Sequence, residues 1–363
     1  MRLVFAGPAR DGGADRGGDL MSITAYLKEI GRGKDGARSL SAAQAEDLLR
    51  QVYQGQVSEV QLGAFAIAMR IKGESPAELA GFLAATQAEI APAIAASVQR
   101  SARPVVWLPS YNGARKLPNL TALLAGLLSQ QGLAVIVHGP GVDPLRVTSQ
   151  AVFAALGWPV IAAADEAATI DAAWGQQQPV FVTTAALCPP LARLLDVRWQ
   201  VGLRNPGHTV AKLLALAPQQ RALPSLQAQP SLPSVRAQPS LRVVNHTHPE
   251  YGASLAQFLA ETQANALLLR GTEGEPVADA RRTPRMDAFV AGQRNETLSV
   301  PAQEGVLARV PQLPSAIDTA TTAAFIQAAL IDPGAVPLPL QTQVRTLTTL
   351  AQHIAQPQQE HAA

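Results

Sequence analysis

The segment Pro104-Val-Val-Trp-Leu108, followed by Pro109-Ser-Tyr-Asn-Gly-Ala-Arg-Lys116, decides the fold of this chain. Its first five residues form a short apolar run with β-branched side chains, which predicts a strand. Residues 120–128 are apolar at helical spacing, and Leu133-Ala-Val-Ile-Val137 predicts a second strand. A strand, a loop, a helix and a strand in this order form a βαβ unit with parallel strands.

The chain before this unit has a helical pattern, and the chain after it alternates between strands and helices. Ser41 and Ser75 stand where helix N-caps are expected, and Pro76 takes the first helical position. We therefore expect an α/β protein with a small all-helical N-terminal domain, residues 21–92. A larger α/β domain, residues 93–363, is expected to have a central, mostly parallel sheet flanked by helices.

Two segments are expected to lie outside the packed core. Residues 1–20 are rich in glycine and arginine and predict a disordered leader, and either Met1 or Met21 is the natural start. Residues 218–241 hold a Pro/Ser/Gln-rich repeat, whose composition is unable to form a core. We expect this insertion to be a mobile surface loop and assign it no function.

Composition limits the possible functions. A chain of 363 residues with 47% hydrophobic residues buries a large core and suggests two domains. The net charge is only +2, so binding to nucleic acid requires a local basic patch. The single cysteine, Cys188, excludes an internal disulfide and is expected to be a buried thiol. No apolar run reaches about 18 residues and no signal-peptide pattern is present, so we expect a cytoplasmic protein without a membrane span.

Four further strings carry family landmarks. They are Gln54–Ser58, Gln61–Gly73, Leu194–Arg198 and Gly202–His208. Together with the βαβ unit they resemble anthranilate phosphoribosyltransferase, the enzyme of tryptophan synthesis that joins a ribose phosphate to an aromatic amine. The resemblance implies the fold described above and a homodimer formed through the helical domain. It also implies that Arg204 matches the arginine that meets the anthranilate carboxylate, and that His208 matches a substrate-side asparagine.

The glycine-rich loop of that family is altered here. In the family, a GTGGD loop brings backbone N–H groups close to the pyrophosphate, because glycine permits conformations that a Cβ blocks. Here only Gly113 remains, between Asn112 and Ala114. We expect the pyrophosphate cradle of this chain to be degenerate.

The other two family signatures are altered as well. The Lys-His-Gly-Asn-Arg string, which meets the phosphates, is replaced by Val137-His-Gly-Pro-Gly141. The Asp-Glu pair that holds magnesium is replaced by Pro276-Val277, although Glu273 and Glu275 lie nearby. His246 and His248 have no third ligand at a zinc-like spacing. We expect no catalytic residues, no metal and no cofactor; the residues assigned to the degenerate cleft are Tyr111, Asn112, Gly113, His138, Gly139 and His208.

A second resemblance concerns function. The strings 108–116, 204–214, 245–251 and 270–279 resemble those of YbiB-type paralogues, which have the phosphoribosyltransferase fold and bind nucleic acid. The resemblance implies a binding protein of weak sequence preference, with DNA or RNA held through phosphate contacts. The alternatives are a pentosyltransferase acting on an aromatic or heterocyclic acceptor, for which Arg204 is retained, and a small-ligand sensor.

The basic residues assigned to nucleic-acid binding follow expected strand ends or stand in short basic runs. They are Arg115, Lys116, Arg146, Arg204, Lys212, Arg281, Arg282 and Arg285. Arginine suits repeated phosphate groups because its planar guanidinium forms paired hydrogen bonds. Each of these residues has an alternative interpretation as a solvated surface charge. Tyr111 is expected either to stack on a base or to pack its loop onto the domain.

Overall fold

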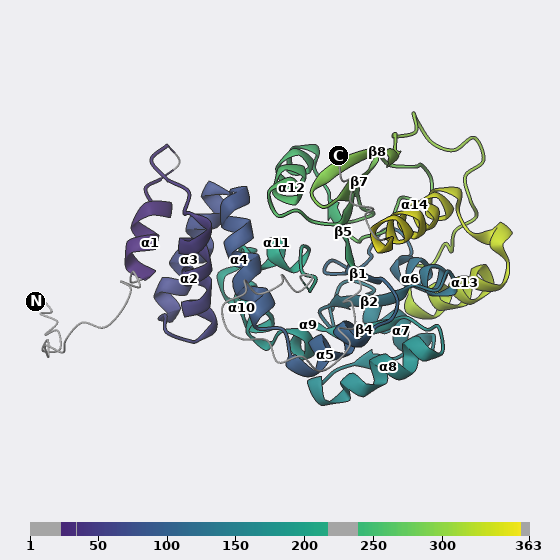
Figure 1. The fold of residues 1–363 in the computed structure, drawn as a ribbon, viewed down its shortest axis with the longest axis horizontal. Coiled ribbons are helices and arrows are strands. Elements are labelled where there is room, and N and C mark those ends of the chain that lie inside the picture. Colours follow the sequence, from purple (N-terminus) through teal and green to yellow (C-terminus); the bar gives the residue numbers. More distant parts are fainter. Residues whose placement is uncertain (1–22, 34, 217–238, 357–363) are drawn as a thin grey trace, which may run out of the picture.

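The computed structural model describes residues 23–33, 35–216 and 239–356 (Figure 1). The expected leader of residues 1–20 lies outside the described residues. The expected insertion, residues 218–241, also lies outside them except at its end, where Ser240 and Leu241 already belong to a strand. The last two residues of the expected loop are therefore corrected to sheet, because strand pairing with residues 105 and 106 satisfies their backbone.

The N-terminal part is helical, as expected, and lies at one end of the molecule in Figure 1. Its helices are α1 (Ile23–Ile30), α2 (Ala42–Tyr53), α3 (Glu59–Lys72), α4 (Pro76–Ala88) and α5 (Pro92–Arg100). Helices α2, α3 and α4 each begin with a capping box, in which an N-cap serine and the third helical residue exchange hydrogen bonds. The predicted caps at Ser41 and Ser75 are confirmed.

One eight-stranded sheet forms the centre of the larger part. Its strands are β1 (Val105–Pro109), β2 (Ala134–Gly139), β3 (Val160–Ile161), β4 (Val180–Thr183), β5 (Ser240–His246), β6 (Ala266–Arg270), β7 (Met286–Val290) and β8 (Gln293–Val300). Their order is β3-β4-β2-β1-β5-β6-β7-β8. All neighbouring strands from β3 to β6 in this order pair in parallel. Strand β7 pairs antiparallel with both β6 and β8. The expected mostly parallel sheet is confirmed.

Helices cover both faces of this sheet (Figure 1). They are α6 (Thr121–Gln130), α7 (Ser149–Ala155), α8 (Ala168–Gly175), α9 (Thr184–Leu187), α10 (Pro189–Val201), α11 (Gly207–Ala211), α12 (Pro249–Glu261), α13 (Thr319–Ile331) and α14 (Leu338–Ala355), with short 3₁₀ turns at Ala164–Ala167 and Pro333–Ala335. Side chains of β1 alternate between the two faces, so Val105 and Trp107 join one core and Val106 and Leu108 the other.

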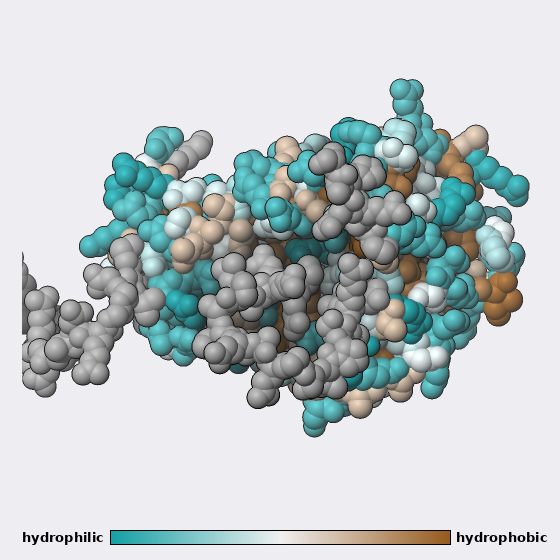
Figure 2. Space-filling view, viewed as in Figure 1, coloured by the Kyte–Doolittle hydropathy of each residue, from teal (hydrophilic) through white to brown (hydrophobic). Residues whose placement is uncertain are grey.

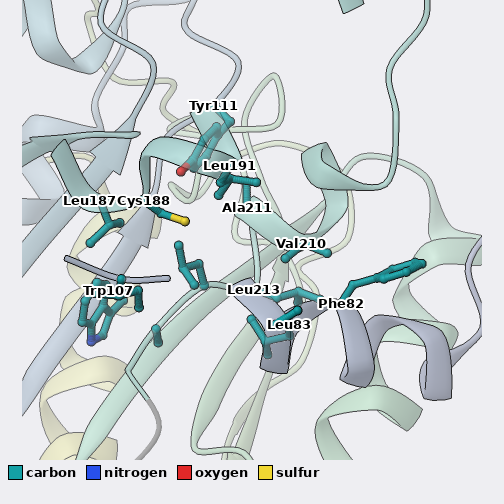
Figure 3. Close-up of a cluster of buried hydrophobic side chains, with 14 of the residues drawn as sticks. Phe82, Leu83, Trp107, Tyr111, Leu187, Cys188, Leu191, Val210, Ala211 and Leu213 are labelled. Carbon is teal, nitrogen blue, oxygen red and sulfur yellow. The ribbon is translucent and has the colours of Figure 1, made fainter. Parts of the chain in front are cut away.

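The core on the Trp107 face also contains residues of the helical part. Phe82 and Leu83 of α4 belong to the same cluster as Leu187 and Cys188, which lie on the α/β side (Figure 3). Cys188 is buried, as predicted, and burial raises the pKa of its thiol to about 12. The two parts of the chain therefore share one hydrophobic core.

The surface and the helix lengths agree with this packing. Figure 2 shows a mainly hydrophilic face, with apolar patches on the side where Figure 1 has α13. Among the described residues, no single helix is long and apolar enough to cross a membrane, although α4 and α5 together pass that test with a bend of 96° between them. Both helices contribute buried residues to the core.

The strand order positions the site. From β1 the chain first builds the β2, β4 and β3 side of the sheet and then returns to build β5 and β6 on the other side. At the point where the strand order reverses direction, the loops after neighbouring parallel strands turn to opposite faces of the sheet and leave a crevice between them. This crevice is the usual ligand site of open α/β sheets. The loop that begins at Ser110 follows β1 and therefore lies at this crevice.

Candidate functional site

The loop after β1 has a conformation that depends on Gly113. This residue has a φ of 68°, and a Cβ there would lie 3.0 Å from the carbonyl oxygen of Val147. The neighbouring Ala114 forms two backbone hydrogen bonds with Val147, each 2.9 Å long. Gly113 therefore lets the loop pass close to the segment before α7.

The carboxylate of Glu275 fills the concave side of this loop. One of its oxygens accepts hydrogen bonds from the backbone N–H of Asn112 at 2.8 Å and of Gly113 at 2.7 Å. The other accepts from the hydroxyl of Ser110 and, at 3.2 Å, from that of Thr121. Glu275 is 2% exposed, so the charge is buried and stabilised by these donors.

Glu273 closes the next part of the same loop. Its carboxylate accepts hydrogen bonds from the backbone N–H groups of Arg115 at 3.1 Å, Lys116 at 2.8 Å and Leu117 at 2.8 Å. Gly274, between the two glutamates, has a φ of 85°, which turns the chain so that both carboxylates face the loop. Five consecutive or nearly consecutive backbone donors are thus used by two carboxylates of the chain itself.

This arrangement is an anion nest with an internal anion in it. Successive backbone N–H groups that point into one concavity bind phosphate in other proteins. Here the same kind of concavity is occupied by Glu273 and Glu275. The hollow that remains beside the loop has a volume of about 70 Å³, whereas small-molecule sites commonly have several hundred. The cleft therefore differs from the family pattern in two ways: residues of the family signatures are lost, and a pair of carboxylates has been added in their place.

Tyr111 packs inward, and the stacking alternative for it is wrong. Its side chain is 6% exposed, and its hydroxyl forms hydrogen bonds with His138 Nδ1 at 3.0 Å and Thr184 Oγ1 at 3.3 Å. Figure 3 draws Tyr111 in the same buried cluster as Cys188. Burial raises the pKa of Tyr111 and lowers that of His138 to about 3. A ring in this position is inaccessible to a nucleobase.

The other residues assigned to the cleft divide into lining and supporting groups. Asn112, Gly113 and His208 line the small hollow. His138 is fully buried, and a Cβ on Gly139 would lie 1.8 Å from the carbonyl oxygen of Ser110, so these two residues support the loop from behind. Burial, and next the charge of the nearby Arg204, lower the pKa of His208 to about 3, so its imidazole is neutral.

Arginines gather at the mouth of the cleft. Arg204 donates to Asn112 Oδ1 at 3.0 Å, and Arg146 donates to the carbonyl oxygen of Gly113 at 3.4 Å. Arg198 lines the same hollow and pairs with Asp143 at 3.5 Å. Desolvation lowers the pKa of the Arg204 guanidinium, and the charges of Arg198, Arg146 and Arg70 lower it further.

Sequence reasoning missed two members of this cluster. Arg198 stands in one of the family strings but was not assigned a role, and Arg70 lies in α3 of the helical part. Only the tertiary fold brings α3 and the end of α10 to the cleft. Among the described residues, neither Arg146 nor Arg204 forms an ion pair within 4 Å, although Asp143, the partner of Arg198, also acts on Arg204 from a longer distance.

The remaining predicted cations differ in accessibility. Arg115 and Lys116 are exposed, and the described residues offer no partner to either side chain. Lys212 instead lies beneath the glutamate turn, where its ammonium contacts Asn245 Oδ1 at 3.3 Å and the carbonyl oxygen of Gly274 at 3.4 Å. Burial lowers the pKa of Lys212 to about 8. This half-buried position differs from the exposed one that a phosphate contact requires.

The basic run near residue 280 lies outside the cleft mouth. Arg281 pairs with Asp279 at 2.9 Å, and Arg285 pairs with Asp287 at 3.0 Å. Arg282 lies 3.9 Å from Asp279. Arg282 and Arg285 line a separate hollow of about 600 Å³ beside α12. Aspartates thus neutralise much of this run, in contrast to Arg146 and Arg204.

Within the described ranges, no group of three or more histidines, cysteines or acidic residues is placed to hold a metal ion. His246 Nδ1 instead lies 3.0 Å from the carbonyl oxygen of His248, which is a local hydrogen bond.

The fold and the crevice define a class of protein. Residues 24–90 match the helical bundle domain of a glycosyl transferase family. The whole fold is similar to anthranilate phosphoribosyltransferase from Thermus thermophilus, with a TM-score of 0.63 and 19% identity, over 92% of this chain and 88% of that one. The enzyme from Saccharomyces cerevisiae in complex with PRPP and Mg gives a TM-score of 0.61 and 12% identity, over 91% and 89%.

Sequence similarity then identifies the branch. The chain is 36% identical over 328 residues to the uncharacterized protein YbiB of Escherichia coli K12. The aligned region covers 89% of this chain and 92% of that protein. It is 30% identical over 193 residues to anthranilate phosphoribosyltransferase from Leifsonia xyli, which covers 50% of this chain and 53% of that enzyme. The chain belongs to the YbiB family.

Proposed function

We propose that this chain binds nucleic acid without sequence preference, through phosphate contacts at the mouth of a closed phosphoribosyltransferase cleft. The observation that carries the proposal is the contrast between the two anion sites. The backbone nest is already occupied by Glu273 and Glu275, whereas Arg146 and Arg204 lie at the mouth and, among the described residues, form no ion pair within 4 Å.

Physical chemistry favours a long polyanion over a small one at this place. A small phosphate ester in the nest would have to displace two carboxylates that together accept five backbone hydrogen bonds. A nucleic-acid strand running across the mouth meets the arginines without displacing the carboxylates. The exposed Arg115 and Lys116 offer it two further cations. Contacts of this kind involve the backbone of the strand and carry no sequence information.

Fluorescence anisotropy of labelled single-stranded and double-stranded oligonucleotides, titrated at two salt concentrations, tests this proposal. Binding is expected to weaken steeply with salt, because each phosphate contact releases condensed counterions. Replacing both Arg146 and Arg204 with alanine is expected to weaken binding to every sequence by roughly tenfold per lost contact. Arg115→Ala with Lys116→Ala is expected to act in the same direction and to flatten the salt slope.

Arg309→Ala combined with Arg345→Ala provides the matched control, since both arginines are exposed, neither lines the hollow, and their loss changes the net charge by the same two units as each double cleft variant. Equal effects of the control and of the cleft variants would reduce the finding to overall charge. No binding at low salt would overturn the proposal. It would redirect attention to the pentosyltransferase alternative, which Arg204 supports and which binding of phosphoribosyl pyrophosphate would test.

We also propose that the protein acts as a cytoplasmic homodimer. Helix α3 exposes Val60, Ile67 and Ile71, whose exposed fractions are 83%, 44% and 65%. A hollow of about 390 Å³ lies beside Ile67 and Ile71, against α1. Exposed apolar patches of this kind mark protein interfaces. Ile71→Asp is expected to give monomers in light scattering, whereas Ile331→Asp, at an 85% exposed position on α13, leaves the dimer intact.

A further inference from the structure

Trp199 is an exposed tryptophan at the mouth of the cleft. It lies in the last turn of α10, and 63% of its surface is exposed. The other three tryptophans differ: Trp107 and Trp174 are buried, and Trp158 is partly buried. Leaving a large aromatic ring in water forfeits the stabilisation that its burial would give, so its exposure suggests a role in binding.

Arg198 holds one side of this ring. Its guanidinium carbon lies 4.0 Å from the centre of the indole, in a cation–π contact. Both side chains line the hollow beside Asn112 and Gly113, so the ring stands next to the altered loop. The contact orients the indole, and the high exposure of Trp199 shows that much of the ring remains open to solvent.

Other apolar side chains extend this surface between the arginines. Val142 and Leu145 are 83% and 80% exposed, and Leu203 is 43% exposed. Leu145 directly precedes Arg146, Leu203 directly precedes Arg204, and Val142 lines the same hollow as Trp199. Surfaces that combine cations for phosphates with aromatic and apolar groups for bases are typical of single-strand binding.

We propose that Trp199, held on one side by Arg198, stacks on an unpaired base of a nucleic-acid strand whose phosphates lie on Arg146 and Arg204. This inference rests on the proposed nucleic-acid binding and specifies its partner as a single strand. A duplex hides the faces of its bases inside the helix, so it engages the arginines alone. Tyr111 also lines the hollow, but its side chain is only 6% exposed and its hydroxyl is bonded to His138 and Thr184, so it offers no open face for stacking.

Tryptophan emission of the full-length protein, excited at a wavelength that nucleic acid does not absorb, tests the proposal. Adding an unlabelled single-stranded oligonucleotide is expected to quench the exposed indole, because a base stacked on the excited ring quenches its emission by electron transfer. A duplex of the same length is expected to bind with little quenching. In Trp199→Phe, the single-strand quenching is expected to disappear.

Affinity measurements on variants provide a second, independent readout. Trp199→Ala is expected to weaken single-strand binding roughly tenfold and duplex binding little, because stacking on one base is lost. Its salt slope stays that of the unaltered protein, since no phosphate contact is removed. Trp199→Phe retains a stacking ring and loses less affinity. Tyr251→Ala is the matched control, since Tyr251 is 49% exposed on α12 and does not line the cleft.

Quenching that persists in Trp199→Phe, or single-strand affinity unchanged in Trp199→Ala, would overturn the stacking proposal and leave the phosphate contacts standing. Protection of Trp199 from acrylamide in the free protein would also overturn it, because a second copy would then cover the ring. Absence of binding by every form of the protein would instead contradict the proposed function itself.

Discussion

Glu275→Ala is expected to destabilise the protein by about 4 kcal/mol, because the buried carboxylate is the acceptor for the altered loop. The substitution leaves the backbone N–H groups of Asn112 and Gly113 without their partner, and each hydrogen bond to a charged group contributes about 1.5–3 kcal/mol. The hydroxyl of Ser110 keeps a second partner, Ser149 at 2.7 Å, so the loss of its hydrogen bond to Glu275 adds less to the destabilisation.

The free energy of unfolding in urea measures this effect. Glu275→Gln keeps one carbonyl oxygen that accepts from both backbone groups, and its amide donates to the nearby hydroxyls. It is therefore expected to cost only about 1–2 kcal/mol. Glu304→Ala, which removes an exposed carboxylate, is the control and is expected to change stability by less than about 0.5 kcal/mol.

A second readout concerns the nest itself. When Glu273 and Glu275 are both replaced with alanine, the five backbone donors become available, and inorganic pyrophosphate is expected to raise the melting temperature of that variant but not of the unaltered protein. Equal stability of Glu275→Ala and Glu304→Ala would refute the reasoning, since it would show that the loop does not depend on the internal anion.

Three further outcomes are expected. The free energy of unfolding decreases as the pH falls from about 6.5 towards 4. The reason is that His138 binds a proton in this range in the unfolded chain but not in the folded protein, where its pKa is about 3. His138→Gln is expected to reduce this pH dependence, which urea unfolding at several pH values measures. Glu78→Ala costs about 3–5 kcal/mol, since it removes the buried carboxylate that pairs with Lys72 at 2.6 Å and accepts from the backbone N–H groups of Leu40 and Ser75; urea unfolding at neutral pH measures this cost. Gly81→Ala costs about 3 kcal/mol, because its Cβ would lie 2.1 Å from a backbone oxygen of α2, whereas Gly63→Ala, with open space around it, does not destabilise.

Local patterns in the sequence were sufficient for the architecture. The βαβ unit around residues 104–137 was readable because apolar periodicity differs between strands and helices. Serine caps at Ser41 and Ser75 act within one helical turn, so they also were predictable. Residues 240 and 241 were assigned to a loop because the repeat continues into β5, and pairing with β1 overrides that local pattern.

The site was predictable only in part. The loss of glycines in the loop was visible in the chain, but the replacement of the bound anion by Glu273 and Glu275 was not, because it joins residues about 160 positions apart. Tyr111 had two open alternatives, and its contacts with His138 and Thr184 decided between them.

The sequence by itself determined the helical and α/β parts, the mostly parallel sheet and the alteration of each family signature, since these depend on neighbouring residues. Tertiary structure decided which charges remain available. It half-buried Lys212, paired Arg281 and Arg285 with aspartates, and brought Arg146 and Arg204 together without an ion pair within 4 Å among the described residues. The physical reason is that the strength of a charge depends on burial and on partners, and both are set by contacts between distant segments.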